Sequence, residues 1–157
     1  MKKLMYFVEP EFVDNSGEKW FGRMSLKLLS MLDQLREETG YSIQIKKTTG
    51  AIGRRQGSSQ HNVNRNNWDE VRAIDISVFN GDGTLLSGNQ AEEFAKKAKN
   101  IGFTGIGVYP LWSTPGFHLD VRWNRNAGDP ATWSDVGVYP EHSYKAINEG
   151  IELWKNR

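Results

Sequence analysis

The sequence predicts an α+β domain in which a small, mainly antiparallel sheet carries helices packed on one face. Two observations lead to this prediction. Apolar residues recur at helical spacing in three segments and alternate with polar residues in four others, in the order helix, strand, loop, strand, helix, strand, strand, helix. The 157 residues suffice for one compact core but not for two. We therefore expect a single domain over residues 1–157.

The first half of the chain contains one predicted helix and two predicted strands. Ser25 is the expected N-cap of a helix that runs to about Glu38 and is ended by Gly40. Residues 41–47 and 71–79 alternate apolar and polar side chains, as half-buried strands do. Between them lies the glycine-rich segment TTGAIGRRQGSSQHNVNRNN, and loops of this length are usually functional or disordered. Its adjacent arginines, Arg54 and Arg55, and its histidine favour function.

The second half begins with a turn at the NGDG segment. Asn89 is the expected N-cap of the next helix, Glu92 completes a capping box, and Gly102 ends the helix. Residues 103–109 and 116–123 are the third and fourth predicted strands.

After the fourth strand the sequence is rich in Asn, Gly, Asp and Pro, which predicts a loop. The chain then closes with a predicted helix from about Ser143. Its apolar stripe consists of Tyr144, Ile147, Ile151 and Trp154.

Composition excludes several classes of function. The net charge is +1, too small to drive binding to nucleic acid. There are no cysteines, so a metal would need histidine and carboxylate ligands. No apolar run approaches the roughly 20 residues that cross a bilayer, so we expect no membrane insertion. Sixteen glycines and six tryptophans predict many loops and a site lined by flat rings.

The opening MKKLMYFVEPEF has an apolar stretch that ends at Glu9, too short for an export signal. It is interpreted as an extended segment of the mature protein. The expected location is a phage virion, or the host cytoplasm with later release to the cell wall.

Candidate functional residues centre on the chain's three histidines, His61, His118 and His142. His118 and Asp120 occupy the polar face of a predicted strand, so their side chains project the same way. Asp75 lies within the apolar run RAIDISVF, where a carboxylate is costly to bury unless it is paired or binds a metal.

Two imidazoles and one carboxylate, His61, His118 and Asp75, form a three-ligand set that leaves a fourth position open, as in catalytic zinc sites. The structural alternative is an ion-paired aspartate with two hydrogen-bonded histidines. The residues alone leave it open, because no HExxH helix is present. His142 is interpreted as a surface or cap residue.

At these residues the sequence resembles the zinc peptidases that include D-Ala-D-Ala carboxypeptidases and phage L-alanyl-D-glutamate endolysins, with hedgehog-type domains as distant relatives. Their pattern S-x-H-x-x-G-x-A-x-D is matched at its start by residues 59–61 and at its end by residues 73–75. GIGVYPLWSTPGFHLDVR, residues 105–122, resembles their later histidine strand. The resemblance covers roughly residues 25–122.

The resemblance implies zinc on His61, Asp75 and His118, with a cell-wall peptide as substrate. It also implies that Arg54 or Arg55 holds a substrate carboxylate or carbonyl, for which a planar guanidinium is well suited.

Two departures from the family pattern affect these expectations. His61 and Asp75 are 14 positions apart rather than seven, so the segment NVNRNNWDEVR holds an insertion, and Trp68 within it is a candidate wall of the cleft. The positions where relatives place a general base hold glycine and proline here, Gly116 and Pro115. Asp120 is the favoured substitute.

Asp69 and Glu70, within the insertion, are the other candidate bases.

The predicted function is zinc-dependent hydrolysis of an amide bond in peptidoglycan stem or cross-link peptides, by a phage endolysin or a tail-associated murein peptidase. The alternative is a non-catalytic peptidoglycan-binding or structural module of a virion or cell envelope. A third reading is an α+β domain without metal. The sequence predicts neither the oligomeric state nor which bond is cleaved.

Overall fold

A computed structural model describes residues 4–157 of the chain, which form three helices and a sheet. The helices and strands are, in chain order, α1 (Leu26–Thr39), β1 (Ser42–Ile45), β2 (Ala73–Phe79), α2 (Gly88–Ile101), β3 (Gly105–Tyr109), β4 (Gly116–Asp120), β5 (Ala131–Asp135), β6 (Tyr144–Lys145) and α3 (Ile147–Lys155), with short 3-10 helices at Glu9–Phe12, Phe21–Arg23 and Arg65–Asn67.

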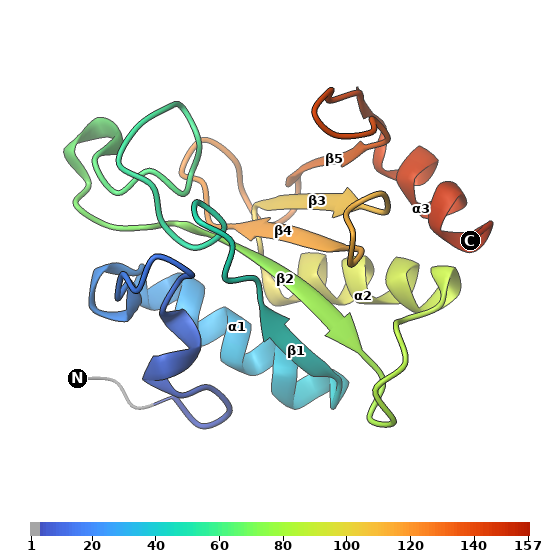
Figure 1. Ribbon diagram of the computed structural model, residues 1–157, viewed down its shortest axis with the longest axis horizontal. Helices are drawn as coiled ribbons and strands as arrows, with labels where there is room; N and C mark the ends of the chain where they lie inside the picture. The colour runs from blue at the N-terminus through green and yellow to red at the C-terminus, as the bar shows by residue number, and fades with distance from the viewer. Residues whose placement is uncertain (1–3) are drawn as a thin grey trace.

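The sheet has six strands in the order β1-β2-β4-β3-β5-β6 (Figure 1). All neighbouring strands pair antiparallel except β3 and β5, which are parallel. The α+β class and the mainly antiparallel sheet predicted from the sequence are therefore confirmed.

The two faces of the sheet differ in chemistry. Ile74 and Ile76 of β2 and Phe117 of β4 are fully buried on one face. Phe94 of α2 and Trp154 of α3 pack against Phe117, with ring centroids 4.6 and 5.3 Å away. Figure 1 shows α1 and α2 behind the sheet, so this face is the one covered by helices. The polar side chains of the same strands point to the opposite face.

Helix α1 has the ends that the sequence predicts. The Ser25 side chain accepts a hydrogen bond from the backbone N–H of Leu28 at 3.3 Å. Gly40 follows the helix with φ of 66°, a left-handed conformation that glycine adopts without strain.

The predicted start of α2 is wrong by two residues. Ser87, not Asn89, is the N-cap, and Gln90, not Glu92, completes the capping box. The same spacing occurs twice in this segment, and the serine two positions earlier is the one the chain uses. The predicted end at Gly102 is confirmed.

The segment after β4 contains two strands that the sequence did not predict, β5 and β6, and the last helix begins at Ile147 rather than near Ser143. Tyr144 lies on β6 and is 59% exposed, so it is not part of the apolar stripe of α3. Its backbone pairs with Asp135 instead.

The N-terminal segment was expected to be extended. Its residues 1–3 lie outside the described part of the chain, and Glu9–Phe12 forms a 3-10 helix that buries Phe12. Within residues 4–157, no helix combines the length and the apolar character needed to cross a bilayer.

Candidate metal centre

The register of the central strands brings two of the candidate ligands together. Asp75 on β2 and His118 on β4 are direct partners in the antiparallel ladder. Side chains of such partners project to the same face of a sheet, here the face opposite Phe117. The pairing of β2 with β4, which are far apart in sequence, thus creates half of the site.

His61 comes from the glycine-rich loop, which backbone hydrogen bonds attach to the edge of β2. The backbone N–H of Asp75 donates to the carbonyl oxygen of Ala51 at 3.0 Å. The Nδ1 atom of His61 lies 2.9 Å from the carbonyl oxygen of Ile52. The loop therefore places the imidazole over β2 in a fixed orientation.

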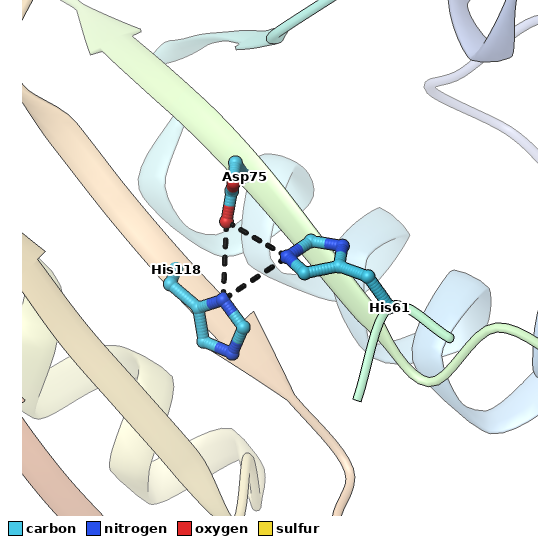
Figure 2. Close-up of side chains that lie close together, drawn as sticks. All are labelled: His61, Asp75 and His118. Atoms are coloured by element: carbon cyan, nitrogen blue, oxygen red, sulfur yellow. Dashed lines mark hydrogen bonds and ion pairs between the residues drawn. The ribbon is translucent and has the colours of Figure 1, made fainter. Parts of the chain in front are cut away.

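The three side chains meet in a small triangle (Figure 2). Asp75 Oδ1 is 3.2 Å from His61 Nε2 and 3.1 Å from His118 Nδ1, and the two ring nitrogens are 3.2 Å apart. A tetrahedral ion with bonds of about 2.0–2.1 Å holds its ligand atoms about 3.3 Å from one another. The spacing fits such an ion, and all three residues are buried.

The far nitrogens of both rings determine their protonation. The Ile52 carbonyl can only accept, so His61 carries its proton on Nδ1. The ionised Asp120 carboxylate likewise accepts from His118 Nε2 at 2.8 Å. The facing nitrogens, His61 Nε2 and His118 Nδ1, then present lone pairs to each other and to the Asp75 carboxylate. Three such donors that converge in a buried space can share a proton or hold a metal ion between them.

The electrostatics of the site also favour positive charge. Burial by itself would lower the pKa of His118, but hydrogen bonds and the charges of Asp120 and Asp75 raise it to about 9. Burial likewise opposes ionisation of Asp75, and the two histidines nevertheless bring its pKa well below its usual range. A proton is therefore held at this position when no metal competes for it.

Asp120 lies behind His118, away from the triangle. It is fully buried and accepts two hydrogen bonds from the Arg122 guanidinium, at 2.9 and 2.6 Å. Burial would raise its pKa, but the bonds to Arg122 and His118 hold it far below the usual range. This position fits a residue that orients His118 and not the general base expected from the sequence.

Two glycines of β3 make room for this arrangement. A Cβ atom at Gly105 would lie 2.1 Å from an oxygen of Asp120. A Cβ atom at Gly107 would lie 2.6 Å from the Trp133 ring. Glycines within a strand, as in the GIG sequence of β3, indicate a close approach of neighbouring groups, and this approach was not predicted.

A cavity of about 1130 Å³ opens over the triangle and extends across the sheet towards β6. Trp133 of β5 lines it next to His118, with ring centroids 5.2 Å apart. Tyr109 and Trp112 stack on each other at 4.2 Å along its wall. Aromatic rings thus line this cavity, as the composition led us to expect of a site, although these particular rings were not predicted.

Of the three predicted substrate-binding residues, only Arg54 lines the cavity. Arg55 is ion-paired with Glu18 and lies 5.1 Å from the Trp20 ring, outside the cavity lining. The expectation of a role for Arg55 is not supported by this position.

Trp68 is also absent from the cavity wall, contrary to the prediction. The Trp68 ring instead packs against two guanidinium groups. The group of Arg72 lies 3.6 Å from the ring centre, and the group of Arg65 lies 5.7 Å from it. The two other candidate bases are similarly remote, since Asp69 pairs with Arg23 and Glu70 pairs with Arg72.

His142 does line the cavity, which its interpretation as a surface or cap residue did not foresee. Its Nδ1 atom lies 2.6 Å from Asp135 Oδ2, and its ring stacks on Tyr144 at 5.5 Å. The side chain remains 57% exposed, and the N-cap of α3 is Ala146.

Comparison with known proteins adds no assignment, since the chain matches no protein-family model, no curated protein and no solved structure. The functional argument therefore rests on the residues and on their geometry.

Proposed function

We propose that this protein is a zinc-dependent hydrolase that cleaves an amide bond in peptidoglycan stem or cross-link peptides. The observation that carries the proposal is the convergence of two imidazole lone pairs and one carboxylate at one end of an open cavity. Such a set holds a metal and leaves a coordination position free for substrate or water.

The ligand types favour zinc over other common ions. Calcium and magnesium take oxygen ligands, whereas two of the three donors here are imidazole nitrogens. Three protein ligands with an open position is the arrangement of catalytic zinc, while structural zinc has four protein ligands. When bound, zinc would polarise a carbonyl group and lower the pKa of water.

The chain's own residues then have separate tasks. His61, Asp75 and His118 hold the metal, and Asp120 fixes the ring of His118 through its Nε2 proton. Arg54 lines the cavity and supplies a guanidinium that can bind a substrate carboxylate by paired hydrogen bonds. Peptidoglycan stem peptides carry such carboxylates, which together with the resemblance of the sequence supports a cell-wall peptide as substrate.

A second candidate function is peptidoglycan binding without catalysis, on a virion or in a cell envelope. It is favoured by one observation: Asp120, Asp69 and Glu70, the bases expected from the sequence, all lie outside the cavity lining. Hydrolysis needs a proton acceptor near the attacking water. The acceptor would then have to come from another cavity residue, and Glu141 and His142 at the β6 end are available.

The deciding experiment is digestion of purified sacculi by metal-free and zinc-loaded protein, followed by mass spectrometry of the released muropeptides. We expect new amino termini with zinc only, and their masses will identify the bond cleaved. Asp75→Asn, which keeps the shape of a ligand but removes its charge, should abolish release. Sacculus binding without any new amino group would select the binding module.

A further inference from the structure

We propose that Tyr109 donates a hydrogen bond to the carbonyl oxygen of the scissile amide as that oxygen gains negative charge. This inference rests on the proposed hydrolysis and adds a catalytic residue to it. In hydrolysis, the oxygen of water bonds to the carbonyl carbon and the C–N bond breaks. A proton from that water is transferred to the released amine. Tyr109 keeps its own proton throughout and contributes only the hydrogen bond.

The sheet register places Tyr109 next to the triangle. Asp75, His118, Gly107 and Trp133 are successive partners across β2, β4, β3 and β5. Tyr109 lies two residues beyond Gly107 on β3, so its side chain projects to the same face. Its partner on β4 is Gly116, which has no side chain to separate Tyr109 from the site.

The hydroxyl group is located by its bond to Trp133. Trp133 Nε1 lies 3.0 Å from the Tyr109 oxygen, and the Trp133 ring is the one that packs beside His118. Both Tyr109 and Trp133 line the cavity that contains the three ligands. A substrate carbonyl held at the metal would therefore lie near this hydroxyl group.

The direction of the Trp133 bond leaves the tyrosine proton available. An indole N–H can only donate, so the tyrosine oxygen is the acceptor and its O–H bond points elsewhere. Within residues 4–157, the Tyr109 hydroxyl donates no hydrogen bond. This half-buried hydroxyl group lines the cavity that contains the three proposed metal ligands. Its proton can therefore be donated to an acceptor on the substrate.

Two further features suit the role. The ring of Tyr109 stacks on Trp112 with an interplanar angle of 17°, which restricts its movement. Burial, together with the nearby charge of Asp75, raises the pKa of Tyr109, so the hydroxyl stays protonated at neutral pH. Preorganised donors of this kind stabilise charge that develops in a transition state.

The cationic side chains nearby are already engaged with protein acceptors. Lys46 donates from Nζ to the carbonyl oxygen of Thr114 at 2.8 Å. Arg122 donates through both Nε and Nη2 to Asp120. These two cations therefore already have protein acceptors, whereas the Tyr109 hydroxyl donates no hydrogen bond to the described residues 4–157.

The test is Tyr109→Phe in the zinc-loaded full-length protein. We expect kcat on muropeptides to fall about 10²–10³-fold with KM little changed, as when an oxyanion donor is removed. Affinity for a phosphinate analogue of the cleaved peptide, measured by calorimetry, should fall by a similar factor, while affinity for the product stays unchanged. Zinc content and melting temperature should match those of the wild type.

Tyr41→Phe is the matched control, because Tyr41 is a partly buried tyrosine packed against the core on the helix side. It should leave both kcat and analogue affinity unchanged. Trp133→Phe removes the bond that orients the hydroxyl, so it should cause a smaller loss. In the double variant with Tyr109→Phe, the two losses should be less than additive.

The outcomes separate the two proposals. If the wild type hydrolyses muropeptides and Tyr109→Phe keeps kcat and analogue affinity within twofold, Tyr109 has no such role and the hydrolase assignment stands. If the zinc-loaded wild type releases no peptide, the hydrolase assignment is wrong and the role of Tyr109 is wrong with it.

Discussion

Two histidine–aspartate pairs line the same cavity or its edge, one on β4 and one between β5 and β6. In the first, His118 and Asp120 lie on one strand and are almost fully buried. In the second, Asp135 is buried at the end of β5, while His142 belongs to the connecting segment and is largely exposed. The pairs are chemically alike, with ring nitrogen to carboxylate distances of 2.8 and 2.6 Å.

The difference lies in the second nitrogen of each ring. His118 turns its Nδ1 towards His61 and Asp75, whereas His142 stacks flat on Tyr144. Asp135 also accepts from the backbone N–H groups of two residues of the connecting segment, at 3.0 and 2.9 Å. The first pair therefore presents a ring nitrogen that could bind a metal ion, and the second pair attaches the connecting segment to β5. A histidine–aspartate contact indicates a metal site only when other donors converge on the free nitrogen.

The largest expected effect separates the two histidines. His118→Ala removes one of three ligands, so zinc content should fall from about one per chain to near zero, and muropeptide release with it. His142→Ala removes a loop contact but no proposed ligand, so this variant should keep about one zinc per chain. Metal analysis of the dialysed proteins makes the comparison. Equal zinc loss in both variants would show that the pairs are not functionally distinct.

Substitution of the two aspartates should also affect zinc binding differently, although the difference should be smaller than that between the two histidines. Asp120→Asn keeps the shape of the group that orients His118 but weakens the bond, so zinc affinity should fall about 10–100-fold. Asp135→Asn should change zinc affinity less than twofold, since no ligand bonds to Asp135. Competition with a chromogenic chelator measures both. If Asp120→Asn leaves zinc affinity unchanged, Asp120 does not position His118 for metal binding.

The second pair should instead appear in the pH dependence of stability. Burial would raise the pKa of Asp135, but bonds from His142 and two backbone N–H groups lower it below 3.8. A lowered pKa in the folded state means that the ionised group stabilises the fold above pH 3.8, and that this contribution is lost as the pH falls through the folded-state value.

Asp135→Asn should therefore reduce the free energy of unfolding by about 2 kcal/mol at pH 7, the range for hydrogen bonds to a charged group. The difference from the wild type should shrink as the pH falls below 3.8 and through the lowered folded-state pKa of Asp135. Urea unfolding of both proteins across this pH range provides the measurement. A difference that is constant with pH would mean that the charge of Asp135 does not hold the loop.

The smallest effect concerns the ring on which His142 lies. Tyr144→Ala removes the stacking contact and should lower the free energy of unfolding by about 1 kcal/mol or less. Zinc affinity should stay the same. A large loss of zinc in this variant would show that the segment around His142 affects the proposed metal site, and that the two histidine–aspartate pairs are not independent.

The part of the site that follows from local sequence pattern was predictable. Alternation within β2 and β4 placed Asp75 and His118 on the polar faces of their strands. The loop histidine was a candidate because the chain has only three histidines, and the family resemblance supported that choice. Their meeting depends on the pairing of β2 with β4, which periodicity cannot reveal. The cluster itself confirms the three predicted ligand positions as neighbours, while the identity of the metal stays a prediction.

The errors have a common physical origin in contacts between distant segments. β5 has a polar sequence, and it becomes a strand because β3 pairs with it in parallel. Arg55 and Trp68 have the residue types of a binding site, but Glu18 and Arg72 engage them elsewhere. His142 was set aside because nothing local distinguishes it, and Asp135 is its neighbour only through the β5–β6 turn. Local patterns do not contain such information.

The residues between His61 and Asp75 form an excursion whose two ends are joined, because the backbone N–H of Arg72 donates to the carbonyl oxygen of Gln60 at 3.0 Å. Because the chain leaves and re-enters at nearly the same point, the length between them is free to vary without moving either ligand. The stretch at residues 66–70, none of which lines the cavity, is therefore a suitable position for an insertion. A recognition peptide or an affinity tag inserted there would be displayed by the scaffold at a fixed place, away from the cavity.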